Sequence, residues 1–177
     1  MYVLAGPDAQ DSRPFRTAGP CVERLAARLA TVTGAEHEAL LAEFWADTER
    51  RGTPLVETVT GEAGDRAVTF LWRGHRATGQ VLLLADGITD PDDLTSSLLD
   101  RLPGTDVWHL TYLLRAGCRG SYRLAADISP GGPPKDPGRL RQRLRALCRY
   151  AAADPLNGRT DGAVRGGAGG SVYVLPG

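Results

Sequence analysis

The apolar residues of this chain change their spacing near Thr53. Upstream they recur every three or four residues, as in GPCVERLAARLAT over 19–31. Downstream, apolar and polar side chains alternate in shorter runs, as in WHLTY over 108–112. The first spacing is typical of amphipathic helices and the second of half-buried strands. Their order predicts an α+β fold in which a helical segment, residues 1–52, precedes a mainly antiparallel β-sandwich, residues 53–177.

A second helix is predicted before residue 53, with start and stop signals of its own. Thr33, with Glu36 three residues later, fits a capping box at the start of the helix. Gly52 ends it and Pro54 follows, which is common after a helix C-terminus. Its apolar face consists of Leu40, Leu41, Phe44 and Trp45.

Residues 102–124 (LPGTDVWHLTYLLRAGCRGSYRL) contain two alternating runs. In the first run Trp108 and Tyr112 share one strand face, and we expect that face to lie in the core. A short loop at 117–120, with glycine at both ends, separates the two runs. Two such runs joined by a short loop predict an antiparallel hairpin.

The remaining strand signals lie on either side of this hairpin. RAVTFLWRG and GQVLLLADG (79–87) predict two strands, with His75 in a hairpin turn between them. A long connection follows, with one helical turn expected at 92–99. SVYVLPG at 171–177 is predicted as the last strand.

One more helix is predicted between the hairpin and the last strand. Asp136 is a suitable N-cap residue, and Pro137 is suited to the first helical position. The apolar stripe of this helix is Leu140, Leu144, Leu147, Cys148 and Ala151. The opposite face carries three arginines at four-residue spacing and two more nearby: Arg141, Arg145 and Arg149, then Arg139 and Arg143.

The formal net charge is zero, but the charge is unevenly distributed. Residues 101–177 contain eleven arginines and one lysine against five aspartates, a local charge of +7, and the first hundred residues balance it. A basic half suits an anionic ligand or an acidic partner. The alternative is that acids of the N-terminal helices neutralise the basic helix. Nucleic acid is not expected, because basic and aromatic residues do not alternate and no nucleic-acid-binding motif is present.

Length and composition indicate one domain with a substantial core, since 42% of the 177 residues are hydrophobic. No apolar run approaches the roughly 20 residues that cross a bilayer. The N-terminus does not resemble a secretory signal, so we expect a cytoplasmic protein without a membrane partner. Cys21, Cys118 and Cys148 are widely spaced, which predicts reduced thiols rather than disulfides or a zinc site.

Catalytic and metal-binding motifs are not evident in the sequence. The GxSxG motif of α/β-hydrolases is absent. One acid–base group stays open as an alternative, formed by Asp106, His109 and Cys118, although isolated His and Cys are usually structural. The aspartates of ADGITDPDD (85–93) are expected to cap turns rather than bind a metal. The glycine-rich segment 159–170 precedes a strand, so it is expected to be a flexible connection rather than a phosphate loop.

Taken in order, several segments resemble the N-terminal domain of enterochelin esterases, the cytoplasmic enzymes that hydrolyse catecholate siderophores to release iron. The resemblance covers roughly Leu40 to Gly177. The segments that carry it are FWADTERRGTPLVE (44–57), VTFLWRG (68–74), DGITD (86–90), LPGTDVWHLTYLL (102–114), RGSYRL (119–124), ADPLN (153–157) and SVYVLPG (171–177).

This resemblance implies an early-set, immunoglobulin-like β-sandwich. In the family a C-terminal α/β-hydrolase domain supplies the Ser-His-acid triad, and the present sequence stops about where that domain would begin. No triad residue can therefore be carried over, and we expect either a piece of a longer protein or a free-standing relative. The resemblance implies no cofactor, because iron would enter only with a bound siderophore.

The first hypothesis is a non-catalytic, substrate-side module that presents a ferric or iron-free catecholate siderophore to a hydrolase domain, in cis or in trans. Its candidate ligand residues, chosen by type and placement, are Trp72, Arg73, Arg119, Tyr122, Arg141 and Arg145. Two alternatives remain open. One is a small enzyme recruited to another reaction, for example in secondary metabolism, and the other is a protein-interaction module with Trp45 or Trp108 partly exposed.

Overall fold

The computed structural model describes residues 14–61, 64–159 and 169–177. Most of the predicted strands and helices are present, some with shifted bounds. In chain order the elements are β1 (Phe15–Thr17), α1 (Pro20–Leu29), α2 (Gly34–Arg51), β2 (Leu55–Thr58), β3 (Asp65–Arg73), β4 (Gln80–Ala85), η1 (Leu94–Ser97), β5 (Asp100–Arg101), β6 (Val107–Arg115), β7 (Arg119–Asp127), α3 (Pro137–Leu147), η2 (Cys148–Tyr150) and β8 (Ser171–Val174).

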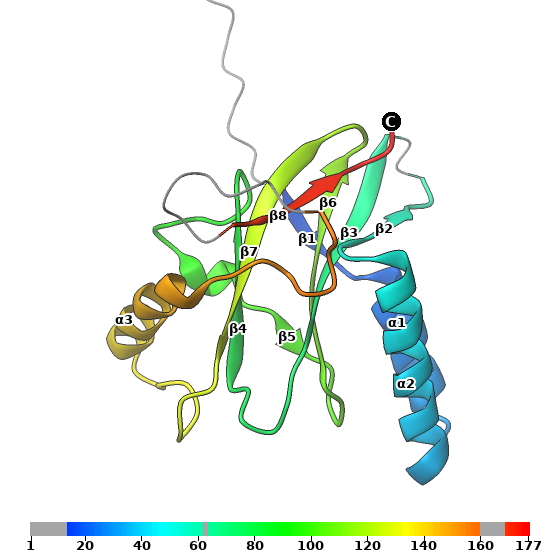
Figure 1. The fold of residues 1–177 in the computed structure, drawn as a ribbon, viewed down its shortest axis with the longest axis horizontal. Helices are drawn as coiled ribbons and strands as arrows, with labels where there is room; N and C mark the ends of the chain where they lie inside the picture. Colours follow the sequence, from blue (N-terminus) through cyan, green and yellow to red (C-terminus); the bar gives the residue numbers. More distant parts are fainter. Residues whose placement is uncertain (1–13, 62–63, 160–168) are drawn as a thin grey trace, which may run out of the picture.

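The strands form two sheets. The first sheet has the order β1-β6-β3-β2, with β5 also paired to β6, and the second has the order β4-β7-β8. Every strand pairing is antiparallel. The predicted α+β class with antiparallel sheets is therefore confirmed (Figure 1).

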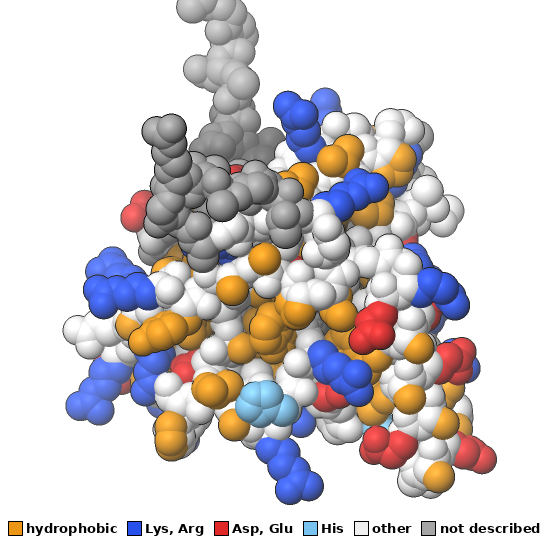
Figure 2. Space-filling view, in the orientation of Figure 1, with side chains coloured by type: hydrophobic (Ala, Val, Ile, Leu, Met, Phe, Trp, Pro, Cys, Tyr) orange, Lys and Arg blue, Asp and Glu red, His pale blue; other side chains and the backbone are white. Residues whose placement is uncertain are grey.

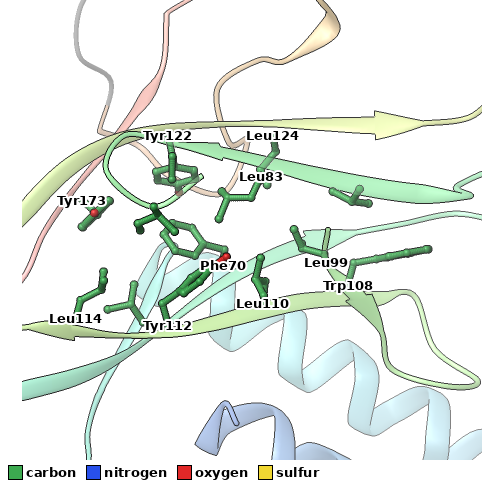
Figure 3. Packing of buried hydrophobic residues seen from close by; sticks show 14 of the residues in the cluster. Phe70, Leu83, Leu99, Trp108, Leu110, Tyr112, Leu114, Tyr122, Leu124 and Tyr173 are labelled. Carbon is green, nitrogen blue, oxygen red and sulfur yellow. The ribbon is translucent and has the colours of Figure 1, made fainter. Parts of the chain in front are cut away.

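The main core lies between the two sheets (Figure 3). Phe70 of β3 contacts two tyrosines of the second sheet edge-on, with ring centroids 4.9 Å from Tyr122 and 5.9 Å from Tyr173. Trp108 and Tyr112 of β6 also face this core, as their alternation predicted. Trp45 lies in a second core and is only 2% exposed. The expectation that Trp45 or Trp108 is partly exposed, on which the interaction hypothesis rested, is therefore wrong.

Both predicted hairpins are wrong. β6 and β7 belong to different sheets, and so do β3 and β4. The loop that follows β6 therefore crosses from one sheet to the other, and the loop around His75 does the same. The physical reason is that alternation determines which face of a strand is buried and does not determine its hydrogen-bonded neighbour. Here each buried face is covered by the opposite sheet.

Helices α1 and α2 pack against the outer face of the first sheet. Their apolar cluster includes Leu25 of α1 and Trp45 of α2, together with Leu71 of β3. Gly52 ends α2 at a φ of 76°, which glycine adopts readily. The predicted capping box does not form, because the side chain of Thr33 makes no capping hydrogen bond. The first turn of the helix is largely exposed, and its first buried residue is Leu41.

Helix α3 packs against the outer face of the second sheet. Asp136 caps it by accepting a hydrogen bond from the Arg139 amide at 2.9 Å, and Leu144 packs with Leu82 and Ala125 of the sheet. Figure 1 shows α3 on the opposite side of the molecule from α1 and α2. The idea that acids of the N-terminal helices neutralise the arginines of α3 is therefore wrong.

The proposed boundary at residue 52 stays a prediction. In the structure α1 and α2 share one apolar cluster with strands of the first sheet. In addition, β1 precedes both helices and pairs with β6. The glycine-rich connection predicted at 159–170 lies almost entirely outside the described residues.

Candidate functional site

Strand β7 presents a basic outer face. Tyr122 and Leu124 point into the core, so Arg119, Ser121 and Arg123 alternate with them on the outside. Their partners across the sheet are apolar: Val174 and Val172 on β8, and Leu84 on β4. Guanidinium groups thus lie among apolar side chains on the second sheet.

A hollow of about 620 Å³ opens between this face, the loop after β4 and helix α3. Arg123 enters it from β7 and Arg145 from α3. Leu84 and Leu94 are among its apolar lining residues, and Asp86 is its acidic one. The hollow therefore combines an apolar surface with two positive charges contributed by different elements.

Neither Arg123 nor Arg145 forms an ion pair with a described acid. In the described part of residues 101–177 only Arg143 does, through Asp127 at 3.2 Å. The charge of Arg123 also reaches Cys148, where burial raises the pKa of the thiol and the nearby guanidinium partly opposes that rise. Within the described part of the chain, no acid pairs with the two positive charges at the hollow.

Two of the predicted ligand residues lie at the far end of the first sheet. Arg73 Nε donates to Asp106 Oδ2 at 3.0 Å, and its guanidinium carbon lies 5.5 Å from the ring centroid of Trp45. Trp72 is half-buried and stands opposite Trp108 across the strand pair. The length of strand β6 separates this end of the sheet from Arg119. That length is about 26 Å at roughly 3.3 Å per residue.

Tyr122 packs in the core and is also among the residues that line the hollow. It is 1% exposed, and its hydroxyl donates to Asp154 Oδ2 at 2.7 Å. It accepts a hydrogen bond from Asn157 Nδ2 at 3.1 Å. Burial raises the pKa of Tyr122, and the negative charge of Asp154 raises it further.

The other predicted ligand residues lie on the second sheet and its helix. Arg119 is on the outer face of β7, and Arg145 lines the main hollow. Arg141 lines a neighbouring hollow of about 340 Å³ together with Lys135 and Asp92. The structure therefore brings Arg145 to Arg123, which the sequence reasoning missed. The alternation in RGSYRL was the available signal, because charged side chains on a half-buried strand belong on its outer face.

The alternative acid–base group is not brought together. His109 lies on the outer side of the first sheet opposite Asp100, whereas Cys118 packs against the core between the sheets. From His109 to Arg115, next to Cys118, the strand extends about 20 Å at roughly 3.3 Å per residue. Asp106 is occupied by Arg73 and by Trp45, whose Nε1 donates to it at 2.8 Å.

The pKa shift of Cys118 does not favour a reactive thiol in this group either. Burial lowers the pKa of His109; the charge of Asp100 opposes this and that of Arg16 adds to it. Burial also raises the pKa of the Cys118 thiol. These directions favour a neutral imidazole, which could accept a proton, and a protonated thiol, which is not an activated nucleophile.

The described residues contain no group of three or more His, Cys, Asp or Glu side chains placed to bind a metal. Two of the aspartates after β4, Asp90 and Asp93, accept hydrogen bonds within the turn. Asp90 Oδ1 accepts from the Asp92 amide at 2.9 Å, and Asp93 Oδ1 accepts from Thr95 Oγ1 at 2.5 Å. Within the described part, no helix has the length and apolar character required to cross a membrane.

The family model described as enterochelin esterase, N-terminal, matches residues 67–177. The chain belongs to this family. It is 37% identical over 149 residues to the iron(III) salmochelin esterase of Escherichia coli O6:H1, a match that covers 84% of this chain and 36% of that protein. It is also 37% identical over 127 residues to the iron(III) enterobactin esterase of Dickeya dadantii, covering 64% of this chain and 29% of that protein.

Solved structures of family members are similar as well. The enterobactin esterase of Shigella flexneri, determined in the presence of 2,3-dihydroxy-N-benzoyl-serine, has a TM-score of 0.55 at 28% identity. That match covers 76% of this chain and 34% of the esterase. The ferric enterobactin esterase of Salmonella typhimurium has a TM-score of 0.52 at 28% identity, covering 73% of this chain and 36% of that one. The chain spans about a third of the length of the curated relatives it matches.

Proposed function

We propose that this member of the enterochelin esterase N-terminal family is a non-catalytic, substrate-side module. It binds an anionic catecholate siderophore and presents it to a hydrolase domain, in cis or in trans, in the course of intracellular iron release. The observation that carries the proposal is the hollow into which Arg123 and Arg145 extend, where neither forms an ion pair with an acid of the described residues.

The chemistry of the hollow fits this class of ligand. Catecholate oxygens bound to iron leave the complex anionic, and guanidinium groups pair well with such oxygens. The aromatic rings of the ligand suit the apolar surface around Leu84 and Leu94. Iron takes part only as cargo of the siderophore, so the protein needs no metal ligand of its own.

The early-set, immunoglobulin-like class of the sandwich and a cytoplasmic location belong to the same proposal. Both follow from the family resemblance. The two stacked antiparallel sheets support the first, because the strands bury alternate side chains between them.

The experiment is a titration of the purified chain with ferric enterobactin, with hydrolysis products assayed in the same tube. Tryptophan fluorescence and calorimetry report binding. The gallium(III) complex is the control, because it has the same charge and lacks the visible absorption that quenches fluorescence. We expect saturable binding of both complexes without hydrolysis. Absence of binding would overturn the module, and hydrolysis by the chain alone would show it to be an enzyme.

A further inference from the structure

We propose that the hollow shared by Arg123 and Arg145 binds an aryl carboxylate, the class of molecule that ester hydrolysis of an aroylated siderophore releases. The identity of the aryl group rests on the proposed function. The carboxylate is inferred from the hollow itself.

The two arginines approach one space from two independent elements. Arg123 lies on β7 directly opposite Leu84, so its side chain leaves the outer face of the sheet beside the apolar lining. Arg145 lies on α3, which packs on the same face through Leu144. A planar carboxylate can accept paired hydrogen bonds from a guanidinium, and such charge-assisted bonds are about twice as strong as neutral ones.

The rest of the lining suits an aromatic ring. Leu84, Leu94 and Pro91 contribute apolar surface to the hollow, and the first two are half-buried against α3. A simple inorganic anion would use the arginines and leave this surface in water. A ligand that carries both a ring and a carboxylate uses both parts.

Asp86 makes the charge of the hollow uneven, because it adds a negative charge to a lining that also contains two arginines. It lies directly after β4, where its amide donates to the Ser121 carbonyl at 3.0 Å, and it is the only carboxylate among the described residues that line the hollow. A ligand carboxylate is repelled near Asp86 and attracted near Arg123 and Arg145. Removing the charge of Asp86 should therefore strengthen binding of the same ligand.

This charge pattern distinguishes an opened ester from an intact one. In ester hydrolysis water adds to the acyl carbon and the acyl carbon–oxygen bond breaks, which yields a carboxylate, an alcohol and a proton. Without iron, the intact ester has no carboxylate for the arginines to bind, whereas the ferric complex of the proposed function offers them anionic catecholate oxygens. The class of reaction that supplies the ligand is thus ester hydrolysis, and the module would retain the opened product.

The experiment compares two probes by calorimetry on the full chain: 2,3-dihydroxybenzoyl-serine and its carboxamide, which differ only in the charged group. We expect the carboxylate to bind about tenfold or more tightly, in line with hydrogen bonds to charged groups. Arg123→Gln and Arg145→Gln should each remove about tenfold of the carboxylate affinity. Asp86→Asn should increase the affinity for the carboxylate probe.

Arg149→Gln is the matched control, because Arg149 is exposed near the same helix end and is not among the residues that line the hollow.

The outcomes separate this inference from the proposed function. Equal affinity for acid and amide would overturn the aryl carboxylate site, even if ferric enterobactin binds. Loss of affinity in Arg149→Gln equal to that in Arg123→Gln would also overturn it, because the effect would then be a general loss of positive charge. Preferential binding of the acid without binding of ferric enterobactin would support the site and overturn the siderophore module. The acid–amide comparison uses the unaltered chain, so it does not depend on how any variant folds.

Discussion

Asp154 is buried among hydrogen-bond donors from distant parts of the chain. The residue is 2% exposed, and its Oδ2 accepts from the Thr53 hydroxyl at 2.6 Å and from the Tyr122 hydroxyl at 2.7 Å. Its Oδ1 accepts from the Leu156 amide at 3.0 Å. The carboxylate thus ties the start of β2 and the middle of β7 to the segment that leads toward β8.

Replacing Asp154 should destabilise the fold more than replacing one of its donors. Asp154→Ala leaves the hydroxyls of Thr53 and Tyr122 buried without their acceptor, at about 1–3 kcal/mol for each group. Tyr122→Phe leaves Asp154 with its other donors and should cost about 1 kcal/mol. Urea denaturation of both variants measures the difference. A loss in Asp154→Ala no larger than that in Tyr122→Phe would contradict this account.

At the residue scale, the sequence indicated the correct faces of β7 but not the role of each side chain. Tyr122 was expected to contact a ligand, yet alternation with Arg119 and Arg123 places it in the core. The position of Arg123 on the outer face follows from the same pattern. Its meeting with Arg145 does not, because that depends on where α3 packs on the sheet.

At the element scale, one partly buried ion pair helps to hold α3 on the second sheet. Asp127, the last residue of β7, is 5% exposed and accepts from Arg143 Nη1 at 3.2 Å and from Gln80 Nε2 at 3.0 Å. Burial by itself would raise the pKa of Asp127. Hydrogen bonds from Ser129, Gln80 and Arg143 outweigh burial and hold the pKa below its ordinary value of 3.8.

This ion pair predicts an acid-sensitive contribution to stability. Because the folded pKa lies below the unfolded one, the contribution is complete above the unfolded value and is lost as pH falls through the folded value. Asp127→Asn should cost about 1–3 kcal/mol at neutral pH. Its unfolding free energy should then fall less steeply than that of the unaltered chain below about pH 4. Urea denaturation at several pH values measures the unfolding free energy of the variant and of the unaltered chain. If both fall equally steeply at acid pH, Asp127 is not the source of the acid sensitivity.

The elements themselves were more predictable than their pairing. Helix α3 begins at the predicted cap, and α2 ends at the predicted glycine. The loop after β6 was expected to close a hairpin, but it crosses between sheets. Apolar spacing reports local burial, whereas the choice of partner strand depends on packing across the whole core. A short glycine-containing loop is compatible with either arrangement.

At the scale of the whole molecule, the net charge is zero, but the two sides differ in how their arginines are paired. Around α1 and α2 the arginines are largely paired, for example Arg24 with Glu57 and Arg28 with Glu43. Around α3 and β7, Arg123 and Arg145 have no such partner among the described acids. Figure 2 shows basic side chains projecting over α3 and mixed charges over α1 and α2. We expect this asymmetry to affect ligand binding more than folding.

Salt should therefore weaken binding of the ferric siderophore while changing the stability of the fold little. The screening length falls from about 10 Å at 0.1 M salt to about 3 Å at 1 M, so a trianionic ligand at an exposed basic hollow should lose roughly tenfold in affinity. Exposed ion pairs contribute only about 0–1 kcal/mol each, so the melting temperature should stay within a few degrees. Calorimetric titration and thermal unfolding in the same salt series measure the two effects.

In Arg123→Gln the salt dependence of the affinity should be shallower than in Arg149→Gln, because only the first substitution removes a charge from the hollow. Affinity unaffected by salt would mean that apolar contacts, rather than the arginines, hold the ligand.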